Sequence, residues 1–376
     1  MALGGWAQLS HGQVVLFEQR FDDPQSVTAT GWDYTLWNPG TVATWAPQGA
    51  SFGDGGLHLD IGAGAGNRVW RVDHNVSPQV GGRYYVRTVM RVWPRPSPEG
   101  LSMLAPGFYG TSIGQLSIIH LTVTADGGLS IAAHTSTQPG GAGVNGLVTM
   151  PVQAGEWMLL ESWLDALGSA DAGHVFALDG VIIERVAADW SGVSSRFFSM
   201  GQLINSSFEG EVDFDEVLVA TAPVPSVLAL RAVETDGGSA LYATAHATFD
   251  GGFMPAPLPL EVQLDDGGFV RTGPSTSPVL TALDQEVLVL EGTAPAGTMT
   301  TARVTGRGLR AAQWVFVGPD AGEAMAPELD GGTQLGGEGT TPREAGQFAV
   351  GCGCSATEAL GAWWLAVVLV GRCRRR

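Results

Sequence analysis

The chain has 376 residues, a formal net charge of −18, 54 glycines and 21 prolines. Its length favours two ordinary domains, and its turn-forming composition indicates many short strands rather than helices. The acidic balance argues against nucleic-acid binding, because no basic patch is available to release counterions from phosphates.

All three cysteines, Cys352, Cys354 and Cys373, lie in the C-terminal tail. The folded part of the chain therefore has no disulfide framework and no cysteine-based metal site.

The N-terminal residues 1–14 have neither a basic segment nor an apolar run long enough for an export signal. The C-terminal tail, residues 350–376, has the layout of a membrane or sorting segment, as described below, and a protein with such a tail must be exported. We therefore interpret residues 1–14 as the remnant of a signal peptide, with the true start codon further upstream.

Residues 15–222 are expected to form an all-β domain, and no segment of it has a helical pattern. The segment 83–93 alternates, which places Tyr85, Arg87 and Arg91 together on one face of a strand. Asp-Gly pairs at 126–127 and 179–180 predict tight hairpin turns. The domain should be a two-sheet sandwich or jelly roll that ends before Pro223. Strands are expected at 83–93, 116–124, 129–133, 157–164, 174–178, 181–186 and 211–220.

Short motifs follow one another along this domain in a fixed order. They are Phe21-Asp22-Asp23 with Trp32, Gly56-Leu-His-Leu, Tyr84-Tyr-Val-Arg, Gly155-Glu-Trp-Met, Leu178-Asp-Gly-Val and Val212-Asp-Phe-Asp-Glu. Their order resembles that of concanavalin A-like, LamG-type jelly rolls. The arginine-containing strand and residues 157–161 also resemble polysaccharide-lyase-like, Cip1-type domains. The resemblance implies a sugar-facing concave sheet, often with calcium nearby, and it does not imply activity.

One motif in the last strand suggests catalysis. Glu211, Asp213 and Glu216 fit the Glu-x-Asp-x-x-Glu signature of laminarinase-type retaining glycosidases, in which the paired carboxylates lie about 5–5.5 Å apart. Alternation puts Glu211, Asp213 and Asp215 on one face, so Glu216 needs a β-bulge to join them. Because the domain ends within a few residues, we favour an ordinary terminal strand whose Asp213 or Asp215 caps a turn or binds calcium.

Further candidates are single side chains. Arg87, Arg91 and His120 could bind an acidic sugar or assist proton abstraction, but we favour a solvated sheet face for the two arginines and a structural role for the histidine. Tyr85, Arg87 and Trp93 are candidates for contacting a glycan, since an exposed indole can stack on a pyranose. Asp22, with Asp213 and Asp215, offers oxygen ligands for Ca²⁺.

Residues 223–318 are expected to form an immunoglobulin-like sandwich that serves as a spacer, and 319–349 an acidic, glycine-rich linker. The sandwich has no cysteines, so this assignment depends on its strands alone. They are expected at 227–233, 242–249, 258–264, 286–290, 300–304 and 314–317.

The tail, residues 350–376, has an unusual layout. From Ala359 to Gly371 every residue is apolar or glycine. As a helix this run is about 20 Å long, and it comes close to spanning the hydrocarbon core of about 30 Å if the helix also includes residues 355–358. Terminal arginines would hold its distal end on the cytoplasmic side. A C-terminal core helix is the alternative, but such a helix usually has one apolar stripe.

This layout resembles the myxobacterial C-terminal sorting signal, MYXO-CTERM. The resemblance implies recognition by a dedicated sorting protease and delivery to the cell surface. The signature cysteine corresponds to Cys352, as the processed or lipid-modified residue. The parts that match are Gly351-Cys352-Gly353-Cys354, the apolar run, and Arg374, Arg375 and Arg376.

The sequence therefore predicts an exported, surface-displayed protein that binds a glycan or acts as an adhesin. Its partners would be a polysaccharide, the sorting protease and the membrane reached by the tail. A surface polysaccharide lyase or glycoside hydrolase that uses the same jelly roll is the alternative, and a purely structural envelope protein is the third. A cleft lined by Arg, His and Tyr would favour a lyase, and a shallow face with exposed Trp would favour binding.

Overall fold

The computed structural model describes fifteen segments of the chain, and all of them are strands, turns or loops apart from short 3-10 turns. No helix in these segments is long and apolar enough to cross a membrane. The predicted signal remnant up to residue 11, the linker from 320 and the whole tail lie outside the described residues. The described segments are 12–25, 33–36, 41–62, 68–73, 82–95, 100–110, 114–123, 128–136, 143–145, 150–192, 195–202, 209–236, 238–265, 267–273 and 277–319.

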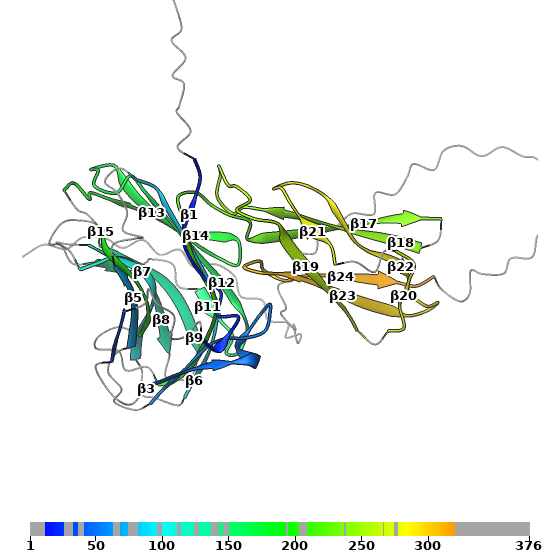
Figure 1. The fold of residues 1–376 in the computed structure, drawn as a ribbon, viewed down its shortest axis with the longest axis horizontal. Helices are drawn as coiled ribbons and strands as arrows, with labels where there is room; N and C mark the ends of the chain where they lie inside the picture. Colours follow the sequence, from blue (N-terminus) through cyan, green and yellow to red (C-terminus); the bar gives the residue numbers. More distant parts are fainter. Residues whose placement is uncertain are drawn as a thin grey trace, which may run out of the picture. The chain divides into compact units, whose positions relative to one another are not determined.

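The first sandwich has two large sheets, drawn in blue to green in Figure 1, so the predicted jelly-roll class is confirmed. Its first sheet has the order β14-β13-β12-β6-β16-β4-β3, and β1 pairs with β16. The strands are β1 (Val15–Gln19), β3 (Thr41–Ala46), β4 (Gly56–Ile61), β6 (Tyr84–Pro94), β12 (Met158–Asp165), β13 (Ala172–Leu178), β14 (Val181–Ala188) and β16 (Gly210–Ala220).

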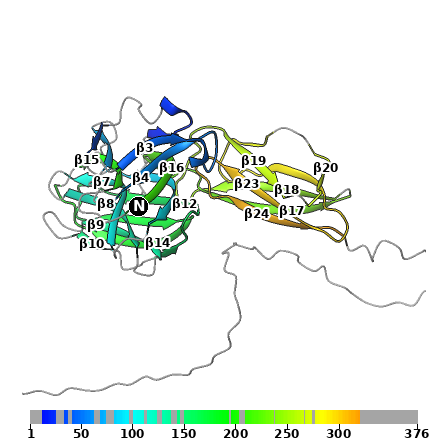
Figure 2. The same ribbon diagram turned by 90° about the horizontal axis from the view of Figure 1, so that it is seen from below.

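The second sheet has the order β10-β9-β8-β7-β15-β5-β2, and β11 pairs with β9. Figure 2 shows β7, β8, β9 and β10 of this sheet side by side. The strands are β2 (Asp33–Leu36), β5 (Arg68–Asp73), β7 (Gly100–Gly110), β8 (Gly114–Val123), β9 (Leu129–Ser136), β10 (Gly143–Asn145), β11 (Met150–Val152) and β15 (Ser195–Gln202).

The second sandwich follows after Pro223 and Pro225 and consists of two four-stranded sheets, β17-β18-β22-β20 and β21-β19-β23-β24. Its core contains Leu241, Leu260 and Val304, which are buried. The strands are β17 (Val227–Thr235), β18 (Gly238–His246), β19 (Leu258–Leu264), β20 (Val270–Arg271), β21 (Val279–Leu280), β22 (Val287–Thr293), β23 (Met299–Gly306) and β24 (Ala312–Val317).

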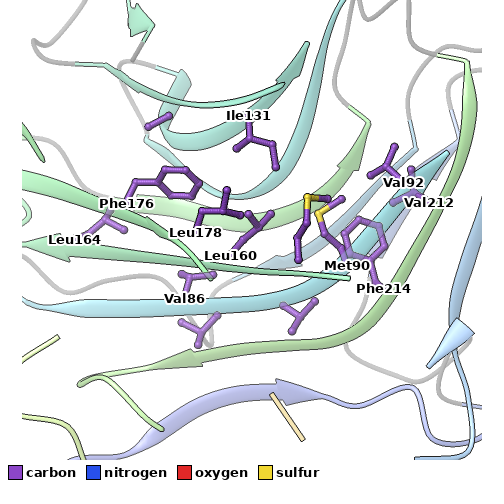
Figure 3. Close-up of a cluster of buried hydrophobic side chains, with 14 of the residues drawn as sticks. Val86, Met90, Val92, Ile131, Leu160, Leu164, Phe176, Leu178, Val212 and Phe214 are labelled. Carbon is purple, nitrogen blue, oxygen red and sulfur yellow. The ribbon is translucent and has the colours of Figure 1, made fainter. Parts of the chain in front are cut away.

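The core of the first sandwich lies between its two sheets. Figure 3 shows alternate residues of β6 and β16 pointing toward Ile131 of the opposite sheet, together with Leu160 and Phe176. Val86, Met90 and Val92 of β6 belong to this cluster. The intervening positions of β6 therefore lie on the opposite face, as the alternation predicts. We call that face, with Tyr85, Arg87, Val89, Arg91 and Trp93, the outer face of the first sheet.

The predicted hairpin turn at Asp179-Gly180 is confirmed. Strands β13 and β14 pair from Leu178 and Val181 outward, and Asp179 and Gly180 both have positive φ, 52° and 79°. A two-residue loop of this kind matches the twist of the strands that it joins. Strands β8 and β9 also pair antiparallel, with Val123 opposite Leu129, and their turn lies outside the described residues.

Strand β16 contains the β-bulge that Glu216 needs in order to lie on the same face as Glu211 and Asp213. Asp213 pairs with Arg91 and Phe214 with Met90, but Glu216 pairs with Val89, so Asp215 is an extra residue. The bulge brings Glu216 to the outer face with Glu211 and Asp213, because one inserted residue reverses the alternation of everything after it.

Candidate functional site

One end of the outer face is covered by the second sandwich. Val224 and Phe249 form a buried cluster there with Tyr85, Leu218 and other residues of the first sheet. The Phe249 ring meets Tyr85 edge-on at 6.1 Å and stacks on Trp163 at 6.4 Å. Aromatic contacts of this size and geometry hold the loop that contains Phe249 against the first sheet.

Arg87 and Glu216 lie beneath this contact. The Arg87 guanidinium donates to both carboxylate oxygens of Glu216, at 3.0 and 3.1 Å, and also to the carbonyl of Pro225. The two side chains are 6% and 1% exposed. The structure thus engages both of these candidate site residues in a buried ion pair.

A second polar cluster lies nearby, around the buried carboxyl of Glu161. Tyr85 donates to Glu161 Oε1 at 2.7 Å, and Thr248 of the second sandwich donates to Oε2. Ser226 lies 2.8 Å from Thr248 Oγ1. Burial raises the pKa of Glu161, and the hydroxyl donors lower it in part. Tyr85 is therefore a fully buried part of the contact between the two sandwiches.

The other end of the outer face is open and carries a group that we call the tryptophan platform, namely Trp93, Arg91 and Trp157. The Arg91 guanidinium lies 4.5 Å from the ring centroid of Trp93 and 4.5 Å from that of Trp157. Asp213 accepts from Arg91 Nε at 2.8 Å, and the carbonyl of Gln48 accepts from Nη2. Both indoles are half-buried. Two cation–π contacts and an ion pair hold the rings rigidly at the surface.

Carboxylates surround the tryptophan platform. Asp213 is buried and also lies 2.7 Å from His58 Nδ1. Arg95 donates to Asp60 at 2.7 Å and to Glu211 at 3.4 Å. These partners come from adjacent strands, because β16 pairs with β4 on one side and with β6 on the other. The platform thus combines flat apolar surfaces with a polar rim of fixed hydrogen-bonding groups.

The carboxylates expected to bind calcium have different surroundings. Asp213 lies between Arg91 and His58, and Asp22 accepts from Arg307 of the second sandwich. Asp215 accepts at Oδ2 from Ser51 at 2.6 Å and from the Phe52 backbone at 3.2 Å. Its buried Oδ1 has no hydrogen-bond partner, and burial raises the pKa of Asp215 to about 7. In the segments that the structure describes, no group of three or more His, Cys, Asp or Glu could hold a metal ion.

His120 lies on the other sheet. In β8 its backbone pairs with Ala132 of β9. The structure does not bring His120 together with Arg87 or Arg91, which belong to the first sheet.

The structure therefore divides the candidates that the sequence suggests. Arg91, Trp93, Glu211 and Asp213 meet at the open end of the outer face, whereas Tyr85, Arg87 and Glu216 lie under the second sandwich. The sequence reasoning did not single out Trp157, His58 and Arg95 as site residues. Their only signal is position, because each lies on or beside a strand next to Arg91 or Glu211.

No family model matches the chain, and no curated protein is similar to it. Solved structures with low similarity include the endo-β-1,4-glucuronan lyase of Trichoderma reesei, at 18% identity and a TM-score of 0.39, covering 56% of this chain and 96% of the lyase. The cellulose-induced protein Cip1 has 17% identity and a TM-score of 0.39, with 55% and 97% covered. The PL-14 alginate lyase of Aplysia kurodai has 9% identity and a TM-score of 0.38, with 55% and 99% covered.

Proposed function

We propose that the protein binds a glycan through the tryptophan platform. The observation that carries this proposal is that Trp93 and Trp157 both lie against Arg91, each ring centroid 4.5 Å from the same guanidinium. Rings fixed in this way present aromatic surface without losing rotamer freedom when a ligand binds. Carboxylates and a guanidinium at the rim are suited to hydrogen-bond sugar hydroxyls.

The carboxylates of the outer face support binding rather than hydrolysis. A retaining glycosidase needs two carboxyl groups that are free to act as nucleophile and acid/base. Glu216 is paired with Arg87 beneath the second sandwich, and Asp213 is held by Arg91 and His58. Glu211 is thus the one exposed carboxyl of the Glu-x-Asp-x-x-Glu motif.

The proposal includes display at the cell surface. The tail from residue 350 would be recognised by a sorting protease and would anchor the chain in the envelope, with the linker acting as a stalk. The support for this part is the sequence pattern of the tail. The second sandwich would serve as the spacer between the stalk and the glycan-binding domain.

We include Ca²⁺ in the proposal, with Asp215 as its ligand. A buried carboxylate oxygen without a hydrogen-bond partner is a donor that a hard cation could satisfy. Asp22 and Asp213 fit less well, because each is already bound to an arginine. Calorimetric titration of chelator-treated protein with Ca²⁺ should give a heat that Asp215→Asn abolishes. Absence of heat from the wild type would remove calcium from the proposal.

The experiment for the main proposal is a binding screen of the purified protein on a polysaccharide panel. Trp93→Ala with Trp157→Ala should abolish binding of any polymer that the wild type retains. The matched control is Tyr242→Ala, because Tyr242 forms a cation–π contact with Arg231 on the second sandwich, 5.3 Å from the ring centroid. Binding that survives the double substitution would contradict the proposal.

The lyase alternative is tested in the same screen. Its candidate base is His120, which the sequence suggests for proton abstraction. Ultraviolet detection of unsaturated uronate products would reveal eliminative cleavage. Product formation that is lost in His120→Ala but kept in the double tryptophan variant would replace binding with lyase activity as the function.

A further inference from the structure

The cations around the tryptophan platform already have anionic partners. Arg91 is bound by Asp213, and Arg95 is bound by both Asp60 and Glu211. His58 lies against Asp213 as well. Within the described part of the outer face, no cation near the platform is therefore free to neutralise an acidic ligand.

The exposed groups that a ligand would meet first carry one excess negative charge. The side chains of Asp60 and Glu211 are 45% and 43% exposed and share one cation, Arg95, which is 42% exposed, whereas Arg91 is 18% exposed. The net charge of the whole chain is −18, which adds a long-range repulsion for polyanions. Carboxylates in this position can accept hydrogen bonds from sugar hydroxyls but would repel a sugar carboxylate.

We infer that the tryptophan platform selects an uncharged glycan and rejects polymers of uronic acids. This inference rests on the proposed glycan binding and adds the chemical class of the ligand. It differs from the expectation that the arginines of the outer face attract an acidic sugar. The reason is that a uronate would have to displace Asp60 or Glu211 from Arg95, or lie beside both of them without a counter-charge.

The test compares soluble oligosaccharides in pairs that differ only at C6. Suitable pairs are β-1,4-glucan with glucuronan, mannan with mannuronan, and galactan with galacturonan, each of the same length and linkage. Titration calorimetry on the full chain at physiological ionic strength should show binding of a neutral member. Its acidic counterpart should bind about tenfold more weakly, because the two carboxylates share a single cation and leave an excess negative charge close to the ligand.

A charge variant tests the residues themselves. Asp60→Asn with Glu211→Gln removes both anions and frees Arg95, so the preference for the neutral member should fall by about tenfold. The matched control is Glu286→Gln, which frees Arg231 from an exposed ion pair of 2.7 Å on the second sandwich. The control should leave the preference unchanged.

The outcomes separate this inference from the proposed function. Equal or tighter binding of an acidic member, abolished by Trp93→Ala with Trp157→Ala, would overturn the charge selectivity and leave glycan binding intact. Absence of tryptophan-dependent binding to every member would overturn both. An unchanged preference in the Asp60 and Glu211 variant would exclude these two carboxylates as its cause.

Discussion

Arg87 and Glu216 form a two-point ion pair beneath the second sandwich, and the backbone of Gly308 lies directly against it. A Cβ atom placed on Gly308 would lie 2.1 Å from Glu216 Oε2 and 2.2 Å from Arg87 Nη2. The pair belongs to the first sandwich, but its cover comes from the second. The ion pair and the docking of the sandwiches therefore depend on each other.

Removing one partner of this pair should strongly destabilise the protein. Glu216→Ala leaves the Arg87 guanidinium buried without its counter-charge, which typically costs about 3–5 kcal/mol of unfolding free energy. Urea denaturation followed by tryptophan fluorescence measures the loss. Glu286→Ala, which breaks an exposed pair with Arg231, should leave the unfolding free energy almost unchanged. Equal effects of the two variants would show that the buried pair is not required for stability.

Gly308→Ala should loosen the docking without changing either core. The residue has φ of +64°, and its Cβ would collide with the buried ion pair. We expect the two sandwiches to unfold in one calorimetric transition in the wild type and in two separate transitions in the variant. Gly251→Ala is the control, because Gly251 also has positive φ, +78°, but open space where its Cβ would lie. If both variants unfold alike, backbone strain alone explains the effect and the contact with the ion pair is irrelevant.

The buried carboxyl of Glu161 should make stability fall as the pH rises. Its pKa is raised in the folded state, so its contribution to stability is present below the unfolded pKa and is lost as the pH rises through the folded value. Glu161→Gln keeps an acceptor for Tyr85 and does not titrate, so its stability relative to the wild type should increase with pH. Thermal melts across the pH range measure the trend.

Glu286 provides a control of opposite sign for this measurement. Its hydrogen bonds with Arg231 lower the pKa of Glu286, so Glu286→Gln should lose stability relative to the wild type as the pH rises from acid. A Glu161→Gln curve parallel to that of the wild type would show that Glu161 keeps its ordinary pKa in the folded protein.

The sorting hypothesis gives a prediction about Cys352. Cys352→Ala should leave both sandwiches folded, since the cysteine lies in the tail, but should keep the protein in the inner membrane with its tail uncut. Fractionation of a myxobacterial host with mass spectrometry of the C-terminus measures both properties. Normal surface delivery of the variant would exclude a role for Cys352, and a full-length cytoplasmic wild type would exclude the sorting signal.

Local patterns predicted most of the first sandwich. The alternation of residues 83–93 placed Arg87 and Arg91 on one face, and Asp179-Gly180 predicted the hairpin that joins β13 to β14. The same reasoning showed that Glu216 could reach that face only through a bulge. Each of these features depends on a few neighbouring residues, and for that reason the sequence was sufficient.

The division of the outer face was not predictable in this way. Tyr85 and Arg87 have the alternation of residues that face water, yet a distant part of the chain covers them. A polar side chain on a strand looks the same in sequence whether its partner is solvent, a ligand or another domain. The contact between Trp157 and Arg91 was not predictable for a related reason, because it joins segments that are far apart in the chain.

The extra residue in β16 also determines which changes of length this strand can accept. Phe214 pairs with Met90 and Glu216 with Val89, so loss of Asp215 alone would leave a regular strand in which Glu216 stays on the outer face and Val217 and Val219 stay in the core. Loss of Val217 or Leu218 would instead bring Val219 to the outer face, whereas loops at the sandwich edges can vary in length at little cost. Among related chains, insertions and deletions should therefore be absent from residues 217–220 even where the sequence has diverged, but loss of Asp215 should be tolerated.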